Sequence, residues 1–81
     1  MPTNVVLTKS GMGIEEGTVV EWLRSIGDRV TAGEVVVEIE TAKAVQEIEA
    51  PASGVLSQIL VQVGETVSVN ADLAIIEDDD G

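Results

Sequence analysis

Short runs of alternating apolar and polar residues recur along the chain, with turn-forming residues between them. The runs are rich in Val, Ile and Leu, and no segment keeps an apolar period of 3.6 residues for long enough to predict a helix. Gly, Pro, Asn and Asp mark the bends between the runs. The pattern predicts an all-β fold, a small sandwich or flattened barrel, whose clearest strands cover residues 4–8, 17–23, 34–40, 44–50, 54–61 and 72–77.

The two halves of the sequence resemble each other at an offset of 37 residues. Both follow the same order of strand, glycine turn, short bridge and strand. This order predicts two similar sheets related by a pseudo-two-fold axis, although turns of the Gly-acidic-x-Val type also recur by chance in β proteins. The offset aligns Gly17 with Gly54, Leu23 with Leu60, Gly27 with Gly64, Asp28 with Glu65, Val30 with Val67, Thr31 with Ser68 and Glu40 with Glu77.

The segments 34–40 and 44–50 are predicted to form a hairpin that bends at Ala42 and Lys43. A slip by one residue would turn the apolar side chains of one strand toward solvent, so a single register is favoured. Lys43 is therefore expected at the exposed tip of the hairpin. The expected pairs are Thr41 with Ala44, Glu40 with Val45, Ile39 with Gln46, Glu38 with Glu47, Val37 with Ile48, Val36 with Glu49 and Val35 with Ala50.

Two features of this hairpin are unfavourable on their own. A two-residue loop prefers Asn-Gly or Gly-x, which adopt positive φ, so Ala42 and Lys43 predict a turn of another type that is held by its surroundings. Glu38 opposite Glu47 is a like-charge pair, which is mildly destabilising. Most lysines in turns only keep the surface soluble, so position alone assigns no function to Lys43.

Composition narrows the chemistry that the domain can perform. The 81 residues make one small domain, 44% hydrophobic but only 1% aromatic, so its core must consist mainly of aliphatic side chains. The absence of Cys and His excludes disulfides, a cysteine nucleophile and the usual metal ligands and general bases. The glutamates around Lys43 favour its ammonium form, the opposite of what a nucleophilic lysine needs. If Lys43 has a function, another enzyme must act on it.

Charge limits the partners that the domain can bind. The chain has 15 acidic and 4 basic residues, a formal net charge of -11, which repels nucleic acids and anionic membrane surfaces. The sequence has no pattern of a signal peptide or of a membrane-spanning stretch. We expect a protein of the bacterial or archaeal cytoplasm, or of the mitochondrial matrix in a eukaryote. We expect the folded domain to cover residues 1–77, and residues 78–81 to be an acidic tail or the start of a linker.

The segment ETAKA, residues 40–44, resembles the lipoyl-lysine motif Glu-Thr-Asp-Lys-Ala of the lipoyl domains of 2-oxo acid dehydrogenase complexes, with Ala42 where the motif usually has Asp. The similarity continues on both sides of the motif, from about Thr8 to Ile76. It implies a flattened barrel of two four-stranded antiparallel sheets, a barrel-sandwich hybrid, with the modified lysine on a protruding hairpin.

The resemblance implies that lipoate is amide-linked to Lys43 by a lipoate ligase or a lipoyl/octanoyl transferase. The lipoyl arm would be reductively acylated by a thiamine-diphosphate decarboxylase, would carry the acyl group to an acyltransferase for transfer to coenzyme A, and would be reoxidised by dihydrolipoamide dehydrogenase. The domain would itself be a non-catalytic carrier, and its parent chain a dihydrolipoamide acyltransferase. The residues that flank the lysine are Glu40, Thr41, Ala42 and Ala44. Of these, Glu40 and Ala44 are implied to help the attachment enzyme to position the lysine.

A loop in the first half is implied to recognise the decarboxylase. Residues 9–17, KSGMGIEEG, match the family's recognition loop, with Ser10 where Leu is often found. Its glycines are equally typical of plain turns. The residues expected to take part are Gly11, Met12, Gly13, Ile14 and Glu15. Packing roles are expected for Trp22, Val30, Val35, Val37, Ile48, Val67, Leu73 and Ile75.

Two alternatives remain open. The biotinyl carrier domains of biotin-dependent carboxylases resemble the same fold, but their lysine lies in Glu-Ala-Met-Lys-Met, and Thr41, Ala42 and Ala44 replace the lysine's neighbours there. Related hammerhead modules in transport proteins are unmodified interaction domains, but they lack a lysine at the tip. The residues around Lys43 favour a lipoyl carrier over both.

Overall fold

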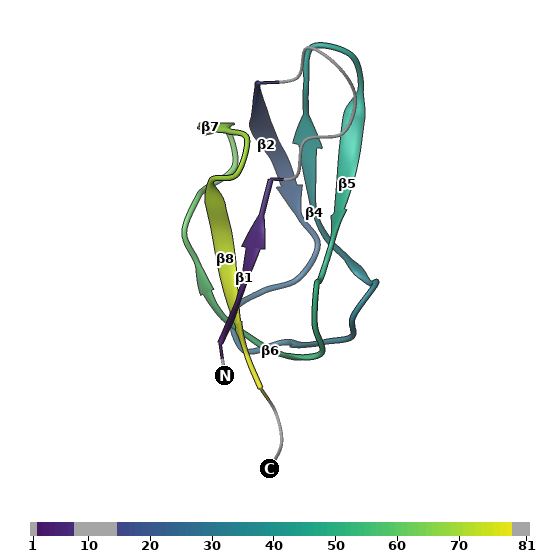
Figure 1. The fold of residues 1–81 in the computed structure, drawn as a ribbon, viewed down its shortest axis with the longest axis vertical. Helices are drawn as coiled ribbons and strands as arrows, with labels where there is room; N and C mark the ends of the chain where they lie inside the picture. The colour runs from purple at the N-terminus through teal and green to yellow at the C-terminus, as the bar shows by residue number, and fades with distance from the viewer. Residues whose placement is uncertain (1, 8–14, 79–81) are drawn as a thin grey trace.

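The protein folds entirely as β-structure in the computed structural model, which describes residues 2–7 and 15–78 (Figure 1). The described residues include no helix that is long and apolar enough to cross a membrane. The strands are β1 (Thr3–Val6), β2 (Glu16–Trp22), β3 (Arg29–Val30), β4 (Val35–Glu40), β5 (Val45–Glu49), β6 (Gly54–Ile59), β7 (Thr66–Ser68) and β8 (Asp72–Glu77).

The strands form two four-stranded antiparallel sheets, in the orders β1-β8-β6-β3 and β5-β4-β2-β7. The predicted all-β fold of two such sheets is therefore confirmed. Each of the six segments predicted from the sequence overlaps one strand, although β1 and β2 begin one residue earlier than predicted. The pattern did not reveal β3 and β7, because two or three residues between turns are too few to show an alternation.

The internal repeat is confirmed in three dimensions. The 37-residue offset aligns β2 with β6, β3 with β7 and β4 with β8. The two strands of each aligned pair lie in different sheets and hold the same position in the strand order. The backbone amide of Gly27 donates to the carbonyl of Leu56 at 2.7 Å, and the equivalent amide of Gly64 donates to that of Val19 at 2.8 Å. Each half thus hydrogen-bonds its glycine turn to a strand of the other half, β6 or β2.

The buried apolar side chains form one core that draws on both sheets. Trp22 is half-buried and packs against this core, as predicted. Its indole N–H also donates a hydrogen bond to the carbonyl of Val61 at 3.0 Å. The core residues are Val5, Leu7, Val19, Val30, Val36, Val37, Ile39, Ile48, Ala50, Leu56, Val61, Leu73, Ala74 and Ile76.

Two details of the predicted packing are wrong, both because the strands contain irregularities. Val35, not Val36, pairs with Glu49, so the expected pairs of Val36 with Glu49 and of Val35 with Ala50 do not form. The register shift lets two consecutive residues, Val36 and Val37, both be buried, which a regular strand does not allow. The other predicted pairs, from Val37 to Thr41, are present.

The same effect shifts the buried residues of β8. Leu73 and Ala74 are both buried. The next residue whose side chain points into the core is then Ile76, whereas Ile75, which was predicted to pack there, is half-buried. A register shift in the pairing of β1 with β8 accompanies this change, because Val5 pairs with Ala74 and Val6 with Asp72, which leaves Leu73 as the extra residue. Val35 and Val67, also expected to pack, are half-buried.

Candidate functional site

Lys43 lies at the tip of the β4–β5 hairpin, where its side chain is exposed, as the sequence predicts. The hairpin projects from one end of the molecule, at the top of Figure 1, whereas β1 begins and β8 ends toward the opposite end. An attachment at Lys43 would therefore lie at the end of the domain away from the start of β1 and the end of β8. Lys43 makes no ion pair with another described residue.

Thr41 shapes the turn that carries the lysine. Its Oγ1 accepts hydrogen bonds from the backbone amides of Lys43 and Ala44, both at 3.3 Å, and donates to the carbonyl of Ala44 at 2.8 Å. The Thr41 amide donates to the same carbonyl at 2.9 Å. Asn70 is the one non-glycine residue with positive φ in the described chain, so the Ala42-Lys43 turn avoids the left-handed region. The predicted turn of another type, held by its surroundings, is confirmed.

The base of the tip rests against β2. Thr41 is only 9% exposed, although its neighbours Ala42, Lys43 and Ala44 are exposed. A Cβ built on Gly17 would meet Cγ2 of Ile39 and come within 3.5 Å of Cγ2 of Thr41. The missing side chain of Gly17 thus allows the end of β4 to close onto β2. Sequence reasoning missed this function of Gly17, for which its alignment with Gly54 was the available signal.

The outer face of this sheet is acidic. Glu38 stands opposite Glu47 of β5 on one side, as predicted, and opposite Glu21 of β2 on the other, so three carboxylates form a row across three strands. Two pairs nearer the tip, exposed Glu40 lies opposite Val45, which is 52% exposed. A partner that approaches the lysine from this face therefore meets carboxylates and the apolar side chain of Val45.

A shallow groove of about 500 Å³ runs beside the tip, lined by Glu15, Glu16, Gly17, Thr18, Glu40, Thr41 and Ala42. Glu15 is the one predicted partner-recognition residue that the structure describes, and the groove brings it close to the lysine's flanking residues. The other four, Gly11, Met12, Gly13 and Ile14, lie outside the described residues. Within the described chain, no group of three or more Asp or Glu side chains is arranged to hold a metal ion.

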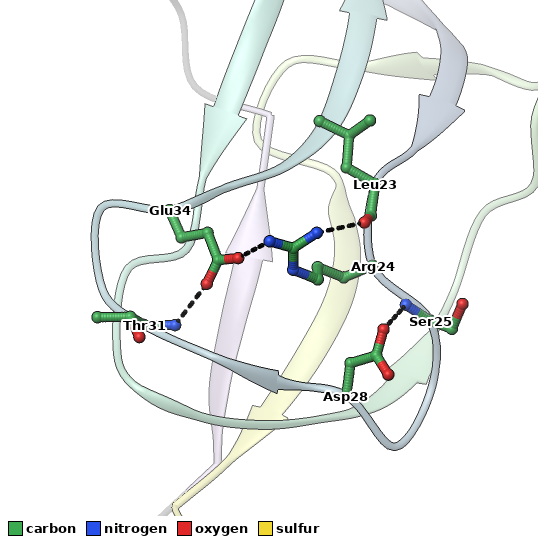
Figure 2. A network of polar contacts seen from close by, with 6 residues as sticks. All are labelled: Leu23, Arg24, Ser25, Asp28, Thr31 and Glu34. Carbon is green, nitrogen blue, oxygen red and sulfur yellow. Dashed lines mark hydrogen bonds and ion pairs between the residues drawn. The ribbon is translucent and has the colours of Figure 1, made fainter.

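A polar network holds the end of β4 that is far from the tip (Figure 2). The Glu34 carboxylate accepts from the amide of Thr31 at 2.9 Å and forms an ion pair with Arg24, which in turn donates to the carbonyl of Leu23 at 2.8 Å. The Thr31 amide, and then the Arg24 guanidinium, lower the pKa of Glu34 below its ordinary value of 4.5. The network fixes the strand whose other end carries the lysine turn.

The sequence matches the biotin/lipoyl family, described as biotin-requiring enzyme, over residues 3–76. The dihydrolipoyllysine-residue acetyltransferase component of the pyruvate dehydrogenase complex of Rhizobium meliloti is 42% identical over 94% of this chain and 17% of its own length. The pyruvate dehydrogenase E1 component subunit beta of the same organism is 39% identical over 98% of this chain and 17% of its length. The chain thus spans about a sixth of these two relatives.

Two solved structures share the fold. The lipoyl domain of the 2-oxoglutarate dehydrogenase complex of Azotobacter vinelandii has a TM-score of 0.70 and 32% identity, over 91% of this chain and 96% of that one. The urea carboxylase of Kluyveromyces lactis has a TM-score of 0.82 and 25% identity, over 95% of this chain but 6% of that one.

The fold, the exposed lysine on a hairpin and the match over residues 3–76 show that the chain belongs to the biotin/lipoyl-attachment family, whose domains carry a group rather than catalyse. Within this family it is a lipoyl domain, similar over almost the whole of both chains to the domain from Azotobacter vinelandii.

Proposed function

We propose that Lys43 carries lipoate through an amide bond between its Nζ and the lipoyl carbonyl carbon. The observation that supports this most directly is the exposed lysine at the tip of a hairpin whose turn and base are both fixed. Amide formation consumes an activated lipoyl donor, releases its activating group and a proton, and removes the positive charge of Lys43. The residues present fit the group, because Lys43 is exposed between the small, exposed residues Ala42 and Ala44.

The bound group supplies a dithiolane that takes up an acyl group together with two electrons. The protein contributes position. The sheets fix the base of the arm, and the exposed position of Lys43 at one end of the domain leaves the arm free to reach several active sites (Figure 1). Tethering raises the local concentration of the reacting group at each site, to the millimolar range for short flexible tethers.

The partners that follow from this function are the attachment enzyme, a thiamine-diphosphate decarboxylase, an acyltransferase core and dihydrolipoamide dehydrogenase. The relatives support this set, because they are components of pyruvate and 2-oxoglutarate dehydrogenase complexes. The acyltransferase component is the parent chain that we propose. The row of Glu21, Glu38 and Glu47, of which Glu21 and Glu47 are exposed, and the acidic groove suit partners with basic surfaces.

The test is modification of the purified domain by a lipoate ligase and, in a parallel reaction, by a biotin ligase, read by intact mass. We expect one lipoyl group on the wild-type domain, none on Lys43→Arg, and no biotin on either. Reductive acylation of the lipoylated domain by decarboxylases that act on different 2-oxo acids then identifies the complex. A lipoyl group on the Lys43→Arg variant would contradict the assignment of Lys43.

A biotin carrier is the second candidate, favoured by the TM-score of 0.82 with the urea carboxylase. Against it stand Thr41, Ala42 and Ala44, which differ from the residues typical around biotinyl lysine. A biotin adduct on the wild-type domain in the parallel reaction would select this candidate. Unchanged activity of the parent complex with Lys43→Arg would instead favour an unmodified interaction domain.

A further inference from the structure

The Thr41 hydroxyl uses all of its hydrogen-bonding capacity inside the lysine turn. A hydroxyl group has one donor and two acceptor positions. Here the donor binds the carbonyl of Ala44, and the acceptors bind the amides of Lys43 and Ala44. In a regular two-residue hairpin the Ala44 amide would bond back to the carbonyl of residue 41. The side chain of Thr41 thus replaces a backbone partner and also binds the amide of the lysine itself.

The methyl group of Thr41 fixes the direction of that hydroxyl. The side chain is almost fully buried, and its Cγ2 lies beside Gly17 of β2. A β-branched side chain has few rotamers, and packing of one branch leaves the other branch little freedom. The body of the domain therefore determines, through one side chain, the backbone conformation at Lys43.

We propose that Thr41 is a positioning residue for the modification of Lys43, because its hydroxyl holds the turn in the conformation that presents Nζ to the attachment enzyme. This inference rests on the proposed function, and it identifies Thr41 as the residue that makes modification of Lys43 efficient. Thr41 takes no part in the new amide bond. Its contribution is to keep the lysine in one competent geometry before the encounter, which avoids an entropic cost during the reaction.

The structure separates this role from a role in stability. Lys43 and Ala44 are exposed, so their amides can bond to water when the Thr41 hydroxyl is removed. Folding then loses little, while the turn gains access to other conformations. When only a fraction of molecules holds the competent turn, the apparent affinity falls by that fraction, whereas turnover of the bound competent form is unchanged. The expected signature is a raised KM with an unchanged kcat.

The experiment compares Thr41→Val, which keeps the shape and loses the hydroxyl, with Thr41→Ser, which keeps the hydroxyl. Thr66→Val is the matched control, because it removes a threonine hydroxyl whose hydrogen bond, 3.0 Å long to Thr18, joins β7 to β2 and not to the lysine turn. The rate of lipoyl transfer by a lipoate ligase, with lipoate and ATP, is measured against domain concentration. We expect Thr41→Val to raise KM roughly 10- to 100-fold, and Thr41→Ser and Thr66→Val to behave like the wild type.

Hydrogen exchange gives a second measurement. The Lys43 and Ala44 amides should exchange faster in Thr41→Val than in the wild type. Wild-type kinetics in Thr41→Val would overturn the inference and leave the proposed function intact. A Thr41→Ser variant as poor as Thr41→Val, or a Thr41→Val variant that does not fold, would also overturn it. A wild-type domain that no ligase modifies would overturn both the proposed function and this inference. A wild-type domain that only biotin ligase modifies would overturn the lipoate assignment, and the Thr41 variants would then be compared with biotin ligase.

Discussion

Gly17 lies directly against Ile39, where the end of β4 closes onto β2. A Cβ on Gly17 would overlap Cγ2 of Ile39 and stand 3.3 Å from the carbonyl oxygen of Glu40. The second half repeats the arrangement, because a Cβ on Gly54 would overlap the carbonyl oxygen of Glu77 and stand 2.9 Å from Cγ2 of Ile76. Both glycines are thus required for close approach of two strands.

Gly17→Ala is expected to destabilise the domain by about 1 to 3 kcal/mol, since the added methyl group overpacks the core. Ile39→Leu removes the Cγ2 branch that the methyl group would meet. The double variant should therefore recover part of the loss, with a coupling of roughly 0.5 to 3 kcal/mol. Urea unfolding followed by Trp22 fluorescence measures all three variants, and strictly additive effects would show that the contact with Ile39 is not the cause.

Asn70 adopts φ 73° at the position equivalent to Gly33, which has φ 90°. Asn tolerates this left-handed conformation better than most residues, whereas Ala does not. Asn70→Ala should cost about 1 to 2 kcal/mol, and Asn70→Gly should cost nothing or stabilise slightly. The amide of Asn70, which donates to the carbonyl of Leu7 at 2.7 Å, is present in both variants. Thermal unfolding of the pair provides the comparison, and equal melting temperatures would argue against backbone strain.

Glu34 makes stability depend on acidic pH. Its pKa is lowered in the folded state, chiefly by the Thr31 amide and next by Arg24, so its contribution is fully present above the unfolded pKa. That contribution is lost as pH falls below 4.5 through the folded pKa. The stability difference between the wild type and Glu34→Gln should therefore shrink between pH 6 and pH 3, in urea titrations at several pH values. An Arg24→Gln background should reduce this pH dependence, and an undiminished dependence there would contradict the role of the ion pair.

Glu38 is flanked by like charges from Glu21 and Glu47 on neighbouring strands. Glu38→Gln should stabilise the domain by about 0.2 to 1 kcal/mol at low salt, because it relieves two cross-strand repulsions. The gain should diminish as salt screens the carboxylates. Glu49→Gln is the control, since Glu49 stands opposite Val35 and its replacement relieves no repulsion with a carboxylate on β4. Equal effects of the two variants at low salt would assign the gain to net charge instead.

The hairpin shows how far the residue pattern alone reaches. Alternation and turn residues located β4 and β5 and the register from Val37 to the tip, because these are properties of neighbouring residues. The extra residue at Val36 was not predictable in the same way, since a regular period of two leaves no room for two consecutive inward side chains. The core accepts both Val36 and Val37, and the strand bends to allow it.

The sequence by itself determined that this chain is made of short strands in two similar halves, and that Lys43 lies at an exposed bend. Local periodicity, turn chemistry and a repeated glycine spacing carry that information. Only the tertiary structure decided how the bend is held, because Gly17 and Thr41 are far apart along the chain and meet only when β2 and β4 pair. The conformation of the lysine turn depends on that contact. The Thr41 hydroxyl holds the turn through hydrogen bonds, so the turn does not need the glycine that is usual in an isolated two-residue hairpin.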